Sequence, residues 1–219
     1  MTAPDPTADQ AETSYVSVDV LALRFDHDRR AVQLGIGIRA TAPFAGRPAL
    51  PGVLLRRGER LGEAGRRALG KIGVTDPTPA MGQLITFDEP NRDPRGPTLS
   101  VALWAVADST GTADWVPLDT PPALAFDHAR IVADCRDLLA GMLWRDLHFT
   151  RALTGPVFAA ADALDVHASL TGRPADRGNL NRVLAGLPGL TKDGVQVARG
   201  RGRPSALWRW QDDAPDGTA

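Results

Sequence analysis

Alternation of hydrophobic and polar residues predicts a β-hairpin near the start of the chain. Residues 16–23 and 31–38 alternate with a period of two, which is the spacing of a half-buried strand. The residues between them, 26–30, are polar and charged, so we expect a turn that joins the two strands. Segments 83–87 and 99–106 follow the same pattern and predict further strands.

Helical spacing predicts two helices in the same region. Residues 59–72 place apolar side chains on one face, and Gly73 is expected to end this helix. Asp127 is expected to cap a second amphipathic helix that extends to about Trp144. Its predicted inward side chains are Ile131, Cys135, Leu138, Leu139 and Met142. A Pro- and Gly-rich segment at 41–52 predicts a loop, and the whole arrangement predicts one α+β unit.

After Asp146 the pattern changes to short helices followed by a hairpin. Residues 150–165 are predicted to be helical despite an internal Gly-Pro pair, and residues 176–187 predict a second short helix. That helix is anchored by Leu180, Val183, Leu184 and Leu187. Residues 195–198 and 206–210 predict two strands that flank a basic tip. Helix, helix and hairpin is the order of a winged helix-turn-helix.

These patterns divide the chain into four segments. We expect a disordered tail at 1–14, an α+β domain at 15–145, a winged helix-turn-helix domain at 146–211 and a short disordered tail at 212–219. The linker at 144–149 is the natural hinge between the two domains.

Composition narrows the class of protein. The chain has 219 residues, of which 43% are hydrophobic and 23% charged, as in ordinary globular proteins. Its single cysteine, Cys135, excludes an intramolecular disulfide and a Cys-based zinc site. The N-terminus lacks the basic start and apolar core of a signal peptide, and no apolar stretch reaches the about 18 residues that cross a membrane. We therefore expect a cytoplasmic protein without a membrane partner.

A basic segment is concealed by the formal net charge of −1. Between Gly172 and Trp210 only Asp176 and Asp193 are acidic. The basic residues of the same stretch are Arg173, Arg177, Arg182, Lys192, Arg199, Arg201, Arg203 and Arg209. A localised basic segment favours a surface that binds a polyanion, and a solvated surface without a partner is the alternative.

Two features within this segment are typical of DNA binding. Asn179 and Arg182 lie three residues apart on one helix face, and such side chains read adenine and guanine in the major groove. Residues 199–205 alternate Arg and Gly before a Pro-Ser pair, an extended strip that can approach a DNA backbone or a narrow minor groove. The candidate DNA-binding residues are Arg177, Asn179, Asn181, Arg182, Arg199, Arg201, Arg203 and Ser205. A basic hairpin without a partner is the alternative.

Residues 51–74 resemble the Nudix signature, written G-x5-E-x7-R-E-U-x-E-E-x-G-U with U apolar. Val53 takes the place of the first glycine, Glu59 matches the first acid and Arg67 matches the arginine. The acids that follow are replaced by Ala68, Gly70 and Lys71. One residue is also deleted before the final Ile-Gly-Val.

The resemblance implies a fold whose enzymes hydrolyse nucleoside diphosphates with a divalent cation. Hard cations such as Mg²⁺ need several oxygen ligands, and the positive charge of Lys71 would repel such a cation. We therefore expect no catalytic residue, no metal and no enzymatic activity. Such a fold can still bind a nucleotide, and arginine forks match phosphate oxygens. The candidate effector-binding residues are Arg47, Arg67, Arg92 and Arg95. The alternative is that Arg67 makes only internal hydrogen bonds and that Arg92 and Arg95 are solvated.

Taken together, the two halves resemble the Nudix-related transcriptional regulator (NrtR) family. The resemblance rests on the degenerate signature, then on the segments 83–96, 124–131, 149–150 and 179–182, and finally on Gly202-Arg203-Pro204 before Leu207-Trp208-Arg209-Trp210. It covers residues 15–211. Leu180 and Asn181 depart from the family's pattern, where an aromatic and a basic residue are more usual.

This resemblance implies a Nudix-like α/β/α sandwich followed by a small winged helix-turn-helix domain. It implies a homodimeric repressor of NAD-metabolism genes that binds a palindromic operator in double-stranded DNA. ADP-ribose or a related NAD metabolite would be the effector, with no cofactor. Relatives also regulate pentose-utilisation genes, so the effector does not follow from the fold. Two alternatives stay open, a divergent pyrophosphohydrolase acting on ADP-ribose-like nucleotides and a nucleic-acid adaptor without sequence preference.

Overall fold

The structure is a computed structural model that describes residues 13–76, 79–107, 113–196 and 205–211. Both predicted disordered tails lie outside the described residues, apart from Thr13 and Ser14, which belong to no helix or strand. Within the described chain, no helix is both long enough and apolar enough to span a bilayer.

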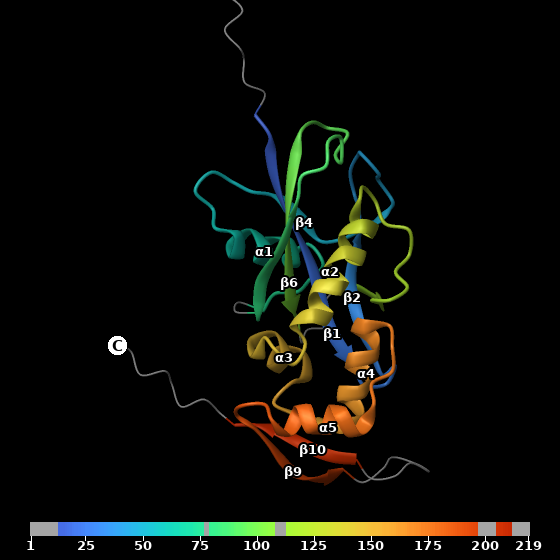
Figure 1. Ribbon diagram of the computed structural model, residues 1–219. Helices are drawn as coiled ribbons and strands as arrows, with labels where there is room; N and C mark the ends of the chain where they lie inside the picture. The colour runs from blue at the N-terminus through green and yellow to red at the C-terminus, as the bar shows by residue number, and fades with distance from the viewer. Residues whose placement is uncertain (1–12, 77–78, 108–112, 197–204, 212–219) are drawn as a thin grey trace, which may run out of the picture.

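A mixed β-sheet forms the centre of the N-terminal part (Figure 1). Its order is β3-β2-β1-β6-β5, and β4 and β7 pair with β1 and β2. The β1–β6 pair is parallel and the other pairs are antiparallel. The strands are β1 (Tyr15–Asp26), β2 (Ala31–Ile38), β3 (Pro48–Ala49), β4 (Gly52–Leu54), β5 (Met81–Phe87), β6 (Thr98–Val106) and β7 (Asp114–Pro117).

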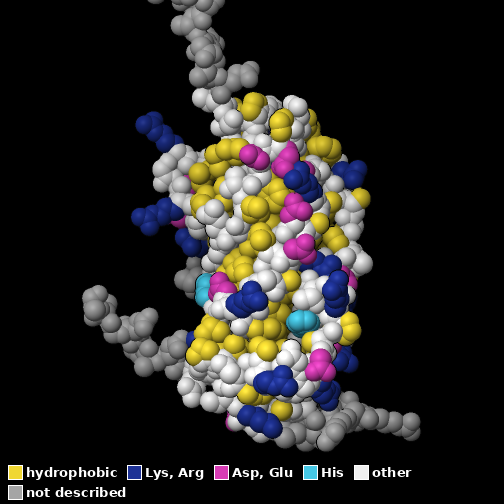
Figure 2. All heavy atoms as spheres, viewed as in Figure 1, with side chains coloured by type: hydrophobic (Ala, Val, Ile, Leu, Met, Phe, Trp, Pro, Cys, Tyr) yellow, Lys and Arg dark blue, Asp and Glu magenta, His cyan; other side chains and the backbone are white. Residues whose placement is uncertain are grey.

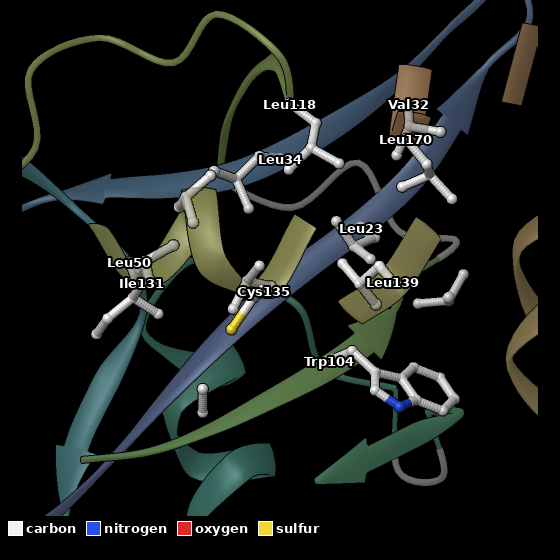
Figure 3. Close-up of a cluster of buried hydrophobic side chains, with 14 of the residues drawn as sticks. Leu23, Val32, Leu34, Leu50, Trp104, Leu118, Ile131, Cys135, Leu139 and Leu170 are labelled. Atoms are coloured by element: carbon white, nitrogen blue, oxygen red, sulfur yellow. The ribbon is translucent and has the colours of Figure 1, made fainter. Parts of the chain in front are cut away.

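Helices cover both faces of this sheet. Helix α1 (Leu61–Gly70) packs on one face, where its small residues contact the side chains of β1 and β6. Helix α2 (His128–Met142) packs on the other face, over a larger apolar cluster that Figure 3 shows around Leu23, Cys135 and Leu139. The N-terminal part is therefore a three-layered α/β/α sandwich, as the family resemblance implies.

The predicted hairpin and main strands are confirmed. β1 and β2 pair in antiparallel register from Ala22↔Gly35 to Asp26↔Ala31, and β5 and β6 contain the other two predicted strands. The loop predicted at 41–52 instead holds β3 and the first residue of β4. Neither of these strands nor β7 was predicted, because two to four residues are too few for an alternating pattern to be read.

The two predicted helices are confirmed, with one error in the assignment of the apolar face. Gly73 adopts a positive φ of 73°, which ends the turn after α1. In α2, Ile131, Cys135 and Leu139 are buried, but Leu138 is 40% exposed. The prediction that Leu138 faces inward is wrong, since its Cβ is rotated by about 100° from that of Leu139 and points away from the sheet.

The C-terminal part consists of a three-stranded antiparallel sheet, β8-β10-β9, and three helices. Its elements are α3 (Leu147–Thr154), β8 (Val157–Ala159), α4 (Ala160–Thr171), α5 (Arg177–Ala185), β9 (Leu190–Gln196) and β10 (Ser205–Trp210). The continuous helix predicted at 150–165 is wrong. Gly155 adopts a φ of 72° and ends α3, Pro156 follows, and β8 pairs with β10 before α4 begins.

The predicted helix at 176–187 corresponds to α5, and the predicted strand at 206–210 corresponds to β10. The strand predicted at 195–198 overlaps β9 only at the last two residues of β9, because β9 begins at Leu190, and residues 197–198 lie outside the described residues. Asp176 caps α5, because its Oδ1 accepts a hydrogen bond of 2.7 Å from Asn179 N. Leu180 and Leu184 are buried as predicted, but Val183 is 37% exposed, so its assignment as an anchor is wrong. Strand, two helices and hairpin form the winged helix-turn-helix that the sequence predicts.

The two parts share an apolar cluster. Phe149 from α3 and Val166 and Leu170 from α4 are buried in the same cluster as the side chains between the large sheet and α2. Figure 3 shows Leu170 beside Val32 of β2. Polar contacts reinforce this junction, since Arg30 forms two hydrogen bonds with Asp165, of 2.8 and 3.1 Å. The domain boundary predicted near residue 146 stays a prediction.

Candidate functional site

A cleft of about 420 Å³ opens at one end of the large sheet. It lies between the start of β1, the loop after β2, β4, α1, the β5–β6 loop and the start of α2. The lining residues that matter for its chemistry are Asp19, Arg39, Gly52, Arg56, Arg67, Lys71, Arg92, Asp93, Arg95, Phe126 and His128. Segments far apart in the sequence therefore meet around one concave surface.

Positive charge dominates this cleft. Six cationic side chains line it, against the two carboxylates of Asp19 and Asp93. A concave site lined by one sign of charge concentrates ligands of the opposite sign. Three of the four arginines predicted to contact an effector, Arg67, Arg92 and Arg95, are among the lining residues. The fourth, Arg47, is exposed and lies outside the lining.

Arg67 holds the loop before α1. Its Nε donates to Glu59 Oε1 at 2.9 Å, and its Nη2 donates to Glu59 Oε2 at 2.7 Å and to Leu54 O at 2.8 Å. The hydrogen bonds from Arg67 and from Arg56 N lower the pKa of Glu59 to about 2. These are the internal hydrogen bonds that the sequence offers as the alternative role of Arg67. The one signature carboxylate that remains is therefore already paired.

Arg92 is buried, not solvated. Its side chain is 5% exposed and donates to both oxygens of Asp127, at 2.8 and 2.9 Å. Asp19 lies 3.8 Å from the same guanidinium. Asp127 occupies the N-cap position of α2, as predicted, but its side chain makes no capping hydrogen bond. Its carboxylate binds the guanidinium of Arg92 instead.

His128 fixes the neighbouring strand. Its Nδ1 accepts a 3.0 Å hydrogen bond from Leu50 N, and its Nε2 lies 3.7 Å from Asp19. Burial lowers the pKa of His128, against the opposing effects of Asp19 and Asp127. The imidazole is therefore held neutral, with Nδ1 as acceptor.

Three cations of the cleft remain without a carboxylate partner within the described residues: Arg39, Arg56 and Lys71. The guanidinium of Arg39 donates to Pro43 O at 2.8 Å and lies 4.5 Å from the centre of the Phe126 ring. Lys71 Nζ donates to Gly52 O at 2.7 Å. Arg95, in contrast, is paired with Asp93 through Nη2 and Oδ2 at 2.6 Å. Sequence reasoning missed Arg39, although its place directly after a predicted strand is a signal that could have found it.

The donor set does not fit a divalent cation. At the positions of the lost signature acids, Ala68 and Gly70 carry no oxygen ligand and Lys71 carries a positive charge. Both oxygens of Glu59 accept hydrogen bonds from Arg67. Over the described residues, no cluster of three or more His, Cys, Asp or Glu side chains is arranged to hold a metal ion.

A second candidate surface is the outer face of α5. Arg177, Asn179 and Arg182 are exposed there, while Asn181 is partly buried. Arg182 Nη1 donates to Asn179 Oδ1 at 3.0 Å, so these two side chains share a face as predicted. Asn181 Nδ2 donates to Arg177 O at 2.9 Å. Figure 2 shows Lys and Arg side chains in dark blue at the lower end of the molecule, where Figure 1 places α5.

The wing is described only in part. Arg199, Arg201 and Arg203 lie outside the described residues. Ser205 is partly buried at the start of β10, where its Oγ accepts a 3.0 Å hydrogen bond from Ala161 N. This contact ties the base of the wing to α4. Arg209 of the central strand β10 donates through Nε to Asp193 Oδ2 of the edge strand β9 at 2.6 Å.

Solved structures share both parts of this fold. NrtR from Shewanella oneidensis matches with a TM-score of 0.68 and 25% identity over 90% of this chain and 94% of that chain. The same protein complexed with a 27mer DNA matches with a TM-score of 0.71 and 22% identity over 90% and 93%. Its NUDIX domain complexed with ADP ribose matches with a TM-score of 0.50 and 25% identity over 62% and 93%. The predicted resemblance to NrtR and the predicted fold class are thus confirmed.

Sequence comparison adds one curated relative. The ADP-ribose pyrophosphatase of Methanocaldococcus jannaschii is 32% identical over 44% of this chain. The chain spans 61% of the length of that protein. No family model matches the chain.

Proposed function

We propose that this chain is a DNA-binding transcriptional regulator, a repressor of NAD-metabolism genes that senses ADP-ribose or a related NAD metabolite. The observation that carries the proposal is the likeness to Shewanella oneidensis NrtR over nearly the whole of both chains. The chain also resembles that protein complexed with DNA, over 90% of this chain, and its NUDIX domain complexed with ADP ribose, over 62% of this chain.

The charge of the cleft supports an anionic effector. Arg67, Arg92 and Arg95 are engaged in ion pairs, so their main role in this proposal is to shape the cleft. Arg39 and Lys71 have donors directed at backbone carbonyls and positive charges without a carboxylate partner in the described chain. Phosphate oxygens are better partners for such donors than neutral carbonyls.

Helix α5 supports the DNA-binding half of the proposal. Its buried side holds Leu180 and Leu184 against the small sheet, and its exposed side presents the Asn179–Arg182 pair. Side chains of these types make bidentate contacts with adenine and guanine. In a homodimer, two copies of α5 about 34–36 Å apart would enter successive major grooves of a palindromic operator.

Release of DNA requires that the effector bind the DNA-free arrangement better than the DNA-bound one. The shared cluster ties α4 to the large sheet, so a change at the sheet can be passed to α5 through α4. We therefore place the moving element at the α4–α5 pair and its neighbours, and not only at the linker 144–149.

Hydrolysis is the alternative function, and the pyrophosphatase relative favours it. Replacement of the signature acids by Ala68, Gly70 and Lys71 argues against it. We expect no magnesium-dependent release of AMP when the protein is incubated with ADP-ribose. If AMP release from ADP-ribose rises with protein concentration and is abolished by EDTA, the chain is a hydrolase and the proposed regulatory function is contradicted.

The DNA-binding half is tested by fluorescence anisotropy on a labelled promoter fragment of an NAD-biosynthesis operon from the same genome. The titration uses physiological salt and excess nonspecific DNA, since phosphate-only binding weakens steeply with salt. We expect Asn179→Ala and Arg182→Ala to weaken specific binding by about 1–3 kcal/mol each. Arg66→Ala, which removes an exposed cation from α1, is the matched control and should leave the affinity unchanged.

Three outcomes are informative. Specific binding that both α5 variants weaken supports the regulator. If nonspecific DNA displaces the labelled fragment as well as unlabelled promoter DNA does, the result supports an adaptor without sequence preference. An absence of binding to any such fragment contradicts the NAD-metabolism assignment and favours the hydrolase.

A further inference from the structure

Lys71 occupies the position at which the Nudix signature places a carboxylate. It follows the last residue of α1, and its side chain lines the cleft with Nζ 2.7 Å from Gly52 O. Gly52 pairs with Asp19 in the β1–β4 ladder, so Nζ lies at the wall that these two strands form. A metal-binding acid has therefore been replaced by a cation whose head group stays within the same cleft.

The surroundings of Lys71 are positive. Burial lowers the pKa of Lys71, and so do the like charges of Arg39, Arg67 and Arg95. The negative charge of Asp19 acts in the opposite direction and raises this pKa. No ion pair joins Lys71 to a carboxylate among the described residues. A divalent cation placed here would add two charges to this repulsion, whereas a phosphate would relieve it.

Arg39 and Arg56 line the same cleft, also without carboxylate partners in the described chain. The pKa of Arg39 is lowered by burial and by Arg95, so its charge too is incompletely compensated. Three cations, from the loop after β2, the loop after β4 and the position that directly follows α1, thus line one space of about 420 Å³. That volume falls in the range of small-molecule sites.

We propose that Lys71, assisted by Arg39 and Arg56, binds the phosphate groups of a diphosphate ligand directly and replaces the divalent cation of Nudix enzymes. The proposal rests on the proposed function, whose effector it refines. A divalent cation at this place would need several carboxylate or water oxygens as ligands. In this chain the lysine carries the positive charge itself, so no carboxylate is needed.

Metal dependence tests this directly. Isothermal titration calorimetry with the full chain at pH 7 measures the affinity for ADP-ribose in EDTA and in excess Mg²⁺. We expect the two dissociation constants to agree within about twofold. Lys71→Gln is expected to weaken binding in EDTA by about tenfold, the loss of one charge-assisted hydrogen bond. Lys192→Gln, an exposed lysine on β9 away from the cleft, is the matched control.

A second readout avoids substitution altogether. The chain contains only two lysines, Lys71 and Lys192, so selective lysine labelling gives two side-chain NMR signals. Addition of ADP-ribose in EDTA should shift the Lys71 Cε signal and leave that of Lys192 in place.

For the calorimetric test, thermal melting of the Lys71→Gln variant checks that its fold is intact.

The outcomes separate this inference from the proposed function. ADP-ribose binding that requires Mg²⁺, or that leaves the Lys71 signal unmoved in EDTA, overturns the inference and leaves the effector in place. Inorganic pyrophosphate that binds in EDTA and shifts Lys71, when ADP-ribose does not bind, supports the inference and removes ADP-ribose as the effector. Failure of both ligands to bind in EDTA overturns the inference.

Discussion

Arg92 and Arg95 lie in the same loop and line the same cleft, but their environments differ. The side chain of Arg92 is 5% exposed and contacts Asp127 and Asp19, whereas that of Arg95 is 49% exposed and pairs with Asp93 two residues away. Removing one member of a buried pair leaves an uncompensated charge, which costs far more than breaking an exposed pair.

We therefore expect Arg92→Met to lower the free energy of unfolding by about 3 kcal/mol, because the carboxylates of Asp127 and Asp19 lose their buried counter-charge. Arg209→Gln breaks a pair whose side chains are 54% and 45% exposed and should cost at most about 1 kcal/mol. Urea unfolding of both variants measures the difference. Equal, small losses would show that Arg92 does not stabilise the fold.

His128 makes a prediction about pH. Burial lowers its pKa in the folded protein, so the unfolded chain binds the proton more readily. Stability is then fully present above the unfolded value of about 6.5 and is lost as the pH falls below it. Urea unfolding between pH 7.5 and 5.5 should show this loss, and His128→Asn, whose oxygen can accept from Leu50 N, should reduce it. An unchanged pH slope in the variant would contradict this assignment.

The sequence predicts which residue types line the cleft better than it predicts their partners. Arg67 lies in the degenerate signature at 51–74, and Arg92 and Arg95 lie in the segment 83–96 that also resembles the family. Their place at the cleft could therefore be predicted. The pairing of Arg92 with Asp127 depends on the approach of the β5–β6 loop to the start of α2, over a separation of 35 residues. No local pattern contains that information, whereas the missed Arg39 did have a local signal in its place directly after a predicted strand.

At the scale of elements, α1 illustrates how closely a helix can pack on the sheet. A Cβ at Gly65 would lie 2.6 Å from Met81 Sδ and 2.9 Å from Leu103 Cδ1, whereas a Cβ at Gly70 would meet nothing within 4 Å. Both glycines belong to the same helix, so they share the same intrinsic preference for alanine.

Gly70→Ala should therefore stabilise the protein by up to about 1 kcal/mol, because it removes the entropic cost of a helical glycine. Gly65→Ala should destabilise it by about 1–3 kcal/mol, because the gain in propensity is outweighed by overpacking against β5 and β6. Thermal or urea unfolding compares the two. Stabilisation by both variants would mean that α1 can move away from the sheet without cost.

Most elements could be predicted from periodicity, and the exceptions share physical causes. The strands β3, β4 and β7 are too short for a pattern and exist because longer neighbours pair with them. The break between α3 and α4 was missed because apolar residues continue through β8. Gly155 and Pro156 carried the correct signal there, and the tertiary pairing of β8 with β10 decides the outcome.

At the scale of the whole molecule, the two parts are joined by more than a linker. Trp104 of β6 contacts Phe149 of α3 with ring centroids 5.1 Å apart, and Val32 N donates to Ser169 Oγ of α4 at 3.1 Å. The sequence predicts two units with a hinge at 144–149. It could not reveal the shared cluster, because the periodicity of α3 and α4 does not identify which surface their apolar faces cover.

We predict that the full chain unfolds in one cooperative transition. Loss of the shared cluster would expose Phe149, Val166 and Leu170, which are at most 1% exposed when folded. Urea curves followed by far-ultraviolet circular dichroism and by tryptophan fluorescence should coincide, since tryptophans lie in both parts. Two separated transitions would show that the parts are independent and that the cluster does not couple them.

The central claim is that a ligand in the cationic cleft controls the DNA affinity of α5. The most direct measurement is a titration of ADP-ribose into the complex of the full chain with a labelled promoter fragment of an NAD-biosynthesis operon, followed by anisotropy at physiological salt. We predict that ADP-ribose releases the DNA, and that Lys71→Gln binds the DNA normally but needs about tenfold more ADP-ribose for release. DNA binding that is specific and that saturating ADP-ribose leaves unchanged would contradict the claim.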